Sequence, residues 1–269
     1  MGVGIFDRLR TAAVGATPRP ATPEQRRRRG GNGASSFHLW WDFDIGVGPF
    51  DAVTATLEVL VPPPVADLHF WALQVDFVDG SGRSIGGAHT GLQHNRDAPA
   101  GGAANWGGYR SGGGGGELDG TPTTLPRVDA GPNTGAYRWR PGSPYRLTID
   151  RGDVGWRSVL DDIDTDTSTV LRELFAPGAV AMSSVVVWSE VFAPCEVRSQ
   201  VRWSQLGVRD LAGTWHQPRA LRPNYQAHSA DGCPDTDSAP DPTVAGSVTQ
   251  TTATPRLHPP DRPITLAAR

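Results

Sequence analysis

The segment Phe37–Ile45 (FHLWWDFDI) contains the first group of side chains that could do chemistry, and they alternate with apolar residues. The odd positions of the segment are all apolar, whereas its even positions are His38, Trp40, Asp42 and Asp44. Strict alternation of this kind predicts a strand with one buried face. Trp40 would then share the other face with an imidazole and two carboxylates, and a wet tryptophan beside acids is typical of a sugar-binding platform.

Two later segments continue the pattern. In Asp67–Val78 the residues Phe70, Gln74 and Asp76 fall opposite an apolar face, and in Val185–Phe192 a valine face leaves Trp188 and Glu190 on the other side. Three strands would thus each give an aromatic ring and an acid or amide to one sheet surface. The alternative is that the aromatic residues belong to the core, because short, largely apolar strands are hard to phase. The predicted ligand-binding residues on these strands are Trp40, Asp42, Gln74, Asp76, Trp188 and Glu190.

A cluster of polar residues (HTGLQHNR) follows the same region of the chain. His89 or His94 could abstract a proton next to a uronate carboxyl group while Gln93 or Arg96 holds that carboxylate, which is the chemistry of a polysaccharide lyase. The alternative is an ordinary hydrogen-bonded strand end. A glycosidase would instead need two carboxylates about 5 to 9.5 Å apart, and Asp42, Asp76 and Glu190 could supply them only from neighbouring strands.

The sequence gives weaker support to a metal site and to serine hydrolase catalysis. The acidic run Asp161–Asp166 offers oxygen atoms to calcium, but it lacks the glycine and terminal glutamate of an EF-hand and reads as a turn. Cys195 and Cys233 have no partner at zinc-ligand spacing, and no GxSxG motif occurs. We therefore expect no cofactor, with a structural calcium ion in the acidic run as the alternative. The two cysteines could form a disulfide, which needs an oxidising compartment, or remain unrelated thiols; both alternatives stay open.

Many short segments with period-two alternation, separated by glycine and proline, predict an all-β protein over residues 37–211. The expected fold class is an antiparallel two-sheet β-sandwich or jelly roll. A long loop is expected over Asn95–Gly135; its aromatic residues Trp106 and Tyr109 join the ligand-binding candidates, because a purely flexible linker has little use for aromatic rings.

The flanks differ from this region. Residues 1–16 have helical periodicity and precede a Pro/Gly-rich linker that carries Arg26–Arg29, so residues 1–36 form either a docking peptide for a protein or membrane surface or an incidental tail. Residues 212–269 read as an irregular proline-rich extension on the sandwich, with an edge strand near residues 246–255.

The net charge and the hydropathy of the chain argue against some kinds of partner and location. The formal net charge of −3 argues against nucleic acid as a partner. No stretch is apolar enough to cross a membrane, and Asp7, Arg8 and Arg10 interrupt the apolar core that a signal peptide requires. The sequence as written therefore predicts a cytoplasmic protein.

Several motifs together resemble a known superfamily. WWDFDI, GLQHN, NWGGY, the YRLTIDRG/GWRSVLDD hairpin and VVVWSEVF resemble, in that order, bacterial concanavalin A-like jelly-roll domains. The resemblance spans about residues 37–206 and implies a polysaccharide-binding or polysaccharide-cleaving relative. Alginate lyases of that group carry a Gln-x-His motif, whereas Gln93 and His94 are adjacent here, so no catalytic residue is transferred.

The sequence thus predicts a carbohydrate-binding β-sandwich with a polysaccharide or oligosaccharide as partner. A polysaccharide lyase or glycoside hydrolase is the first alternative. A non-catalytic interaction domain recruited by its N-terminal helix is the second.

Overall fold

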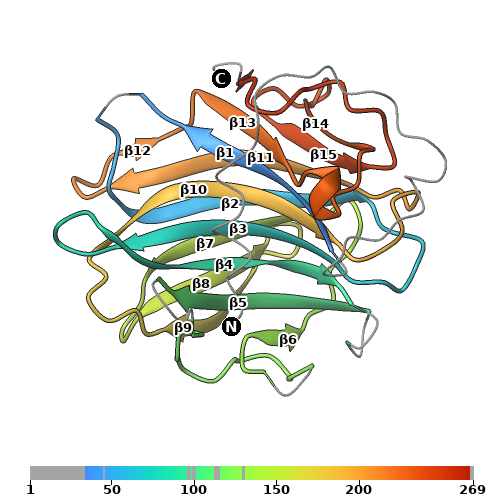
Figure 1. Ribbon diagram of the computed structural model, residues 1–269. Coiled ribbons are helices and arrows are strands. Elements are labelled where there is room, and N and C mark those ends of the chain that lie inside the picture. Colours follow the sequence, from blue (N-terminus) through green and yellow to red (C-terminus); the bar gives the residue numbers. More distant parts are fainter. Residues whose placement is uncertain are drawn as a thin grey trace.

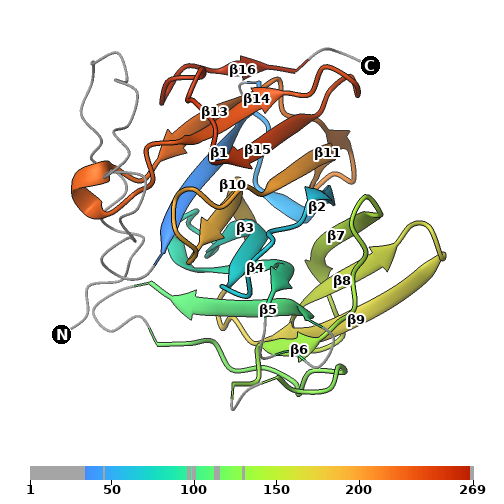
Figure 2. The same ribbon diagram turned by 90° about the vertical axis from the view of Figure 1, so that its right-hand side faces the viewer.

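The computed structural model describes residues 34–44, 46–95, 98, 101–111, 116–128 and 131–266 (Figure 1). These residues form sixteen strands and one short 3-10 helix, η2 (His228–Ala230). All sixteen strands belong to two antiparallel layers, which Figure 2 shows side by side. The predicted all-β, two-sheet sandwich is therefore confirmed. Residues 1–16, for which the sequence predicts a helix, and Arg26–Arg29 lie outside the described residues. No helix among the described residues has the length and apolar character to cross a bilayer.

The first sheet has the order β16-β13-β1-β10-β3-β4-β5-β6. Its strands are β16 (Ile264–Thr265), β13 (Ala220–Tyr225), β1 (Ser35–Asp42), β10 (Ala181–Val191), β3 (His69–Val78), β4 (Ser84–His94), β5 (Gly102–Arg110) and β6 (Thr134–Ala136).

The second sheet has the order β14-β15-β11-β2-β7-β8-β9, and the short β12 pairs with β11. One register position, Met182 opposite Phe50, joins it to the first sheet. Its strands are β14 (Thr236–Pro240), β15 (Val248–Thr252), β11 (Gln200–Asp210), β2 (Phe50–Val61), β7 (Pro144–Arg151), β8 (Trp156–Asp162), β9 (Thr167–Leu174) and β12 (Trp215–His216).

The core lies between the two sheets, because alternate residues of each strand point inward. Leu39, Leu73 and Val187 of the first sheet are fully buried there, which confirms the apolar faces expected from alternation. The rings of Phe77 and Trp156 meet across the interface with centroids 5.2 Å apart. Because the apolar residues of these strands face the core, the polar residues that alternate with them lie on the outward side of the first sheet.

The segment expected as a loop over residues 95–135 contains strand β5. Trp106 lies in that strand and points into the core, where its Nε1 donates a hydrogen bond to the Trp156 backbone carbonyl at 3.1 Å. Its side chain is fully buried, so Trp106 holds the sheets together and cannot contact a ligand on the outer surface.

Residues after 211 are more regular than expected, since they contribute β12 to β16. Strand β13 pairs with β1, and β15 lies between β14 and β11 instead of at an edge. The buried Gln250 of β15 accepts hydrogen bonds from the Trp203 indole at 2.9 Å and the Ser189 hydroxyl at 3.0 Å, and donates to the Phe37 carbonyl at 2.9 Å. The C-terminal extension is thus an integral part of the sandwich.

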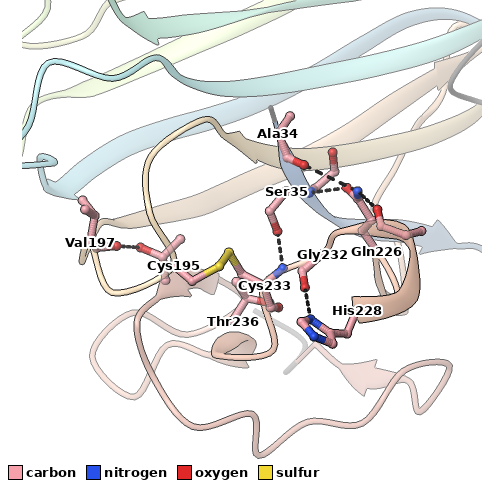
Figure 3. Close-up of a disulfide and its surroundings, with 12 residues drawn as sticks. Ala34, Ser35, Cys195, Val197, Gln226, His228, Gly232, Cys233 and Thr236 are labelled. Atoms are coloured by element: carbon pink, nitrogen blue, oxygen red, sulfur yellow. Dashed lines mark hydrogen bonds between the residues drawn. A yellow bond between two sulfur atoms is a disulfide. The ribbon is translucent and has the colours of Figure 1, made fainter. Parts of the chain in front are cut away.

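Cys195 and Cys233 form a disulfide with a Cα–Cα distance of 5.5 Å (Figure 3). It joins the connection between β10 and β11 to the segment that leads into β14. The Cys233 backbone N–H also donates to the Ser35 hydroxyl at the start of β1, at 2.7 Å. Of the two alternatives left open by the sequence, the structure has the disulfide.

Candidate functional site

The outward side of β1, β10, β3, β4 and β5 is a surface of aromatic and polar residues, which we call the polar face. Antiparallel register places its residues in rows that cross the strands. Rows of this kind lie about 7 Å apart, because side chains on one face recur every second residue. The rows are Ser36–Glu190–Phe70–Gln93–Ala103, His38–Trp188–Ala72–Gly91–Asn105, Trp40–Val186–Gln74–His89–Gly107 and Asp76–Gly87–Tyr109.

Gln74 is at the centre of the polar face. Its side-chain carbonyl accepts a hydrogen bond from the Trp188 indole at 3.0 Å, and its amide donates to the Tyr109 hydroxyl at 3.3 Å. Tyr109 reaches Gln74 across Gly87, where an added Cβ would lie 2.7 Å from the Tyr109 hydroxyl oxygen. Because Gly87 has no side chain, one hydrogen-bonded chain spans the strands from β10 to β5.

Trp188 is enclosed by three rings. Its centroid lies 4.9 Å from that of Phe70, 5.7 Å from that of His89 and 6.2 Å from that of His38. The contacts with Phe70 and His89 are edge-to-face, an arrangement that aromatic quadrupoles favour. Trp188 is only 4% exposed, so it supports the polar face and does not offer its ring to solvent.

Trp40 is the partly exposed tryptophan of this surface. Its ring lies nearly parallel to that of His38, at an interplanar angle of 18° and a centroid distance of 6.4 Å. Tyr109, Asp76, His89 and Glu190 are also partly exposed. These five residues are therefore the part of the polar face that a ligand can reach first.

The two histidines of the polar face are neutral at pH 7. Burial lowers the pKa of His38 and that of His89 to about 4, because removal from water disfavours the charged imidazolium. Within the described part of the chain, Nδ1 of each ring is buried without a hydrogen-bond partner. Both rings act mainly as aromatic neighbours of Trp188.

Burial shifts the pKa of Glu190 in the opposite direction, upward. Burial raises the pKa of its carboxyl group, and a long hydrogen bond from the Ser36 hydroxyl, at 3.5 Å, opposes the rise only in part. Glu190 therefore keeps its proton to a higher pH than an exposed glutamate would. In that form it can donate a hydrogen bond as well as accept one.

The predicted lyase residues are not gathered at one point. His89 and Gln93 lie on the polar face, two rows apart, and the Gln93 side-chain carbonyl accepts from Asn95 at 3.4 Å. His94 belongs to the other face of β4, and its Nε2 contacts the Val65 carbonyl at 2.7 Å. Arg96 lies outside the described residues.

Register also places the carboxylates. Glu190 is opposite Phe70 and Asp76 is opposite Ser183, so Asp76 and Glu190 are separated along the strands by about 20 Å at roughly 3.3 Å per residue. That separation is too large for a glycosidase pair. Asp42, at the end of β1, forms an ion pair with Arg222 of β13.

The acidic run Asp161–Asp166 lies at the turn between β8 and β9. Asp162 accepts hydrogen bonds from Arg140 at 3.0 Å and from the Thr165 backbone at 3.3 Å, as in a turn. Among the described residues, no group of three or more potential ligands is placed to hold a metal ion.

The predicted ligand-binding residues did not include His38 or Phe70, although the alternation places both on this face. Both were nonetheless in phase with the selected residues, His38 two positions before Trp40 and Phe70 four before Gln74. The period-two pattern was thus the signal that could have found them.

Comparisons with known proteins give only distant similarity. No protein-family model and no curated protein matches the chain. A solved structure of scytalido-glutamic peptidase with a peptide-based transition-state analogue has a TM-score of 0.44 at 11% identity, covering 82% of this chain and 97% of that one. SCP-B, a member of the eqolisin family of peptidases, in complex with the tripeptide Ala-Ile-His, has the same TM-score at 10% identity, with coverage of 82% and 97%. The CBM2 module of the evolved Dit protein of Lactobacillus casei BL23 phage J-1 has a TM-score of 0.37 at 13% identity, covering 59% of this chain and 62% of that one. The class defined by the chain's own coordinates is an antiparallel β-sandwich with an aromatic and polar outer face on one sheet.

Proposed function

We propose that the protein is a carbohydrate-binding β-sandwich of the concanavalin-like type that takes a polysaccharide or oligosaccharide on its polar face. The observation that carries the proposal is the position of Trp40. It is a partly exposed ring in the same row as Gln74, with the carboxyl groups of Glu190 and Asp76 in other rows of the same surface. Aromatic rings take the apolar face of a sugar ring, and amides and carboxyl groups bind its hydroxyls.

The residues have different roles in this proposal. Trp40 stacks on the sugar, while Glu190, Asp76 and Tyr109 lie along the ligand. Trp188 and Gln74 are buried, and they fix the strands and the Tyr109 hydroxyl in place. The arrangement is built on rigid strands, which position a binding group more accurately than loops do.

A glycan array probed with the full chain tests the proposal. We expect selective retention of one class of polysaccharide, at least tenfold weaker retention for Trp40→Ala, and partial recovery for Trp40→Phe. Trp215→Ala is the matched control, because Trp215 is 51% exposed on β12, outside the polar face. Equal losses for Trp40→Ala and Trp215→Ala, or no retention of any glycan, would overturn the proposal.

Polysaccharide cleavage is the second candidate, and the neutral state of His89 favours it. A histidine that is neutral at pH 7 can accept a proton, and His89 is partly exposed on the same surface. Incubation with uronate polysaccharides would then release unsaturated ends with ultraviolet absorbance, and His89→Gln would abolish the release while weakening glycan retention less than Trp40→Ala does. Retention without any product would leave binding as the function.

A further inference from the structure

The polar face differs from the outer side of the second sheet in its charged residues. The chain contains no lysine, so arginine is the basic residue that stays charged at any ordinary pH. Among the described residues, the four rows of the polar face contain no arginine. The strands of the second sheet carry arginines on their outer side, each next to a core residue of its strand: Arg146, Arg157, Arg202 and Arg209. Positive charge is therefore unevenly divided between the two outer sides of the sandwich.

Arg222 of β13 borders the polar face, where it lies opposite Trp40 of β1 in the antiparallel register. Its guanidinium group donates two hydrogen bonds, from Nε and Nη2, to the carboxylate of Asp42 at the end of β1. A bidentate pair of this kind uses the fork of the guanidinium group and compensates its charge. Arg222 therefore adds no net positive charge at the Trp40 end of the polar face.

The ionisable side chains within the rows are neutral or acidic. Burial keeps His38 and His89 uncharged at pH 7, because it lowers their pKa values to about 4. Asp76 and Glu190 supply carboxyl groups, and burial raises the pKa of Glu190, so this group can also donate a hydrogen bond. Gln93 adds an amide without adding charge. The described part of the polar face thus offers donors and acceptors to hydroxyl groups, and it offers no cation to a carboxylate or a sulfate.

An anionic ligand would lose hydration on this surface without gaining an ionic partner. Removal of an ionised carboxylate from water is strongly unfavourable unless charged or hydrogen-bonding groups replace the water. A ligand carboxylate would also meet the acidic side chains of this surface, and like charges oppose association. The ring face of Trp40 carries the negative part of its quadrupole, so it favours the C–H groups of a sugar over an anion. Uncharged hydroxyl groups avoid these costs, because they exchange hydrogen bonds with water for hydrogen bonds with the protein.

We propose that the polar face takes neutral glycans and excludes chains that carry carboxylate or sulfate groups. The inference rests on the proposed function, because it names the class of saccharide for the same surface. It is carried by the absence of arginine from the described rows, together with the pairing of Arg222 to Asp42. Uronate polysaccharides, which the second candidate function requires, are among the ligands that it excludes.

Retention of the full chain on matched pairs of glycans tests the inference. The pairs are cellulose, mannan, galactan and laminarin, each beside a counterpart whose primary alcohols are oxidised to carboxylates or sulfated. We expect the best-retained ligand to be neutral and its anionic counterpart to be retained at least about tenfold more weakly. Equal or stronger retention of the anionic members would overturn the inference and leave the proposed function standing. No retention of any glycan would overturn both.

The salt dependence of retention gives an independent measurement. Retention of a neutral glycan should change less than about twofold between low ionic strength and about 1 M sodium chloride, where the Debye length is about 3 Å, because there is no ion pair to screen. Retention that falls steeply with added salt would mean that cations of the protein hold the ligand, and it would overturn the inference.

Asp76→Asn links the selectivity to the polar face. It removes one negative charge from a partly exposed position, so retention of an anionic glycan relative to its neutral counterpart should rise at least about threefold. Asp231→Asn is the matched control, because it removes the same charge from an exposed residue next to η2, outside the polar face. An equal rise for the two variants would indicate a general charge effect, and no rise for Asp76→Asn would show that this surface does not set the selectivity. Either result would overturn the inference.

Discussion

The Trp188 indole donates its hydrogen bond to the side chain of Gln74 at 3.0 Å, and this bond joins neighbouring strands on a face that has no contact with the main core. The bond matters for the stability of the fold because both side chains are buried. The Trp188 donor and the Gln74 acceptor are both buried and lie on different strands, so removal of one leaves the other without a partner and away from water.

Gln74→Ala should lower the free energy of unfolding by about 1 to 3 kcal/mol, because it leaves the buried Trp188 N–H without an acceptor. Trp188→Phe in the same background removes that unsatisfied donor and should restore part of the loss. Urea denaturation of the two single variants and the double variant measures this coupling. Strictly additive losses would show that the hydrogen bond contributes nothing.

Acid should destabilise the protein between about pH 6.5 and pH 4. The pKa values of His38, His69 and His89 are lowered to about 4 by burial, so in this range the unfolded state binds protons that the folded state does not. Stability is therefore complete above the unfolded pKa and falls as the pH drops, by up to about 1.4 kcal/mol per pH unit for each histidine.

Urea denaturation of the wild type and of His38→Phe at pH 7, 5.5 and 4.5 measures how the free energy of unfolding depends on pH. His38→Phe should flatten the pH dependence of the free energy of unfolding by up to one proton. A wild-type slope retained in full by His38→Phe would mean that His38 is already accessible to protons in the folded state.

Loss of the disulfide should lower the free energy of unfolding by about 4 kcal/mol on a chain-entropy estimate for a closed loop of this length. The two cysteines are separated by 38 residues, and both are buried. The reduced protein, or Cys195→Ser with Cys233→Ser, should melt at a lower temperature than the oxidised protein. Thiol titration in denaturant gives the redox state directly: no free thiol before reduction and two after it.

This titration also bears on localisation. The sequence predicts a cytoplasmic protein, where reductants keep most thiols free, whereas the structure contains a buried disulfide. Protein isolated from its native cells with two free thiols would support the cytoplasmic prediction. Full oxidation would favour an oxidising compartment.

Gln250→Leu should destabilise the protein by more than about 2 kcal/mol, since it deprives two buried donors, from Trp203 and Ser189, of their shared acceptor. Thr249→Val on the same strand is a suitable comparison, because among the described residues the Thr249 hydroxyl makes a single long hydrogen bond, to the Ala239 carbonyl at 3.5 Å. Thermal melts of both variants measure the difference. Similar melting temperatures would assign the effect to the strand and not to the amide.

Alternation predicted the outward residues of β1, β3 and β10, because each of these three strands has one strongly apolar side. Trp188 and Glu190 could be phased from Val185, Val187 and Val191, and Gln74 could be phased from Leu73 and Val75. The exposure of Trp188 could not be predicted, since it depends on Phe70, His38 and His89, which come from three other strands. Strand adjacency is a tertiary property that one sequence does not contain.

Two parts of the fold escaped prediction for compositional reasons. Strand β5 is rich in glycine and alanine, so its sequence resembles a loop although Trp106 anchors it in the core. Strand β15 (VTQTT) is polar but buried, because hydrogen bonds from neighbouring strands satisfy its side chains. Hydrophobic periodicity detects neither kind of strand.

The pairing of β1 with β10 and β13 has a consequence for synthesis on the ribosome. Ser35 pairs with Val191, and Phe37 pairs with both Ser189 and Tyr225. Strand β1 is therefore synthesised long before either of its neighbours, β10 or β13, and contacts so distant in sequence form slowly. Until then the aromatic residues of β1 are exposed and can form non-native contacts. We therefore expect a chaperone to bind the nascent chain during this interval.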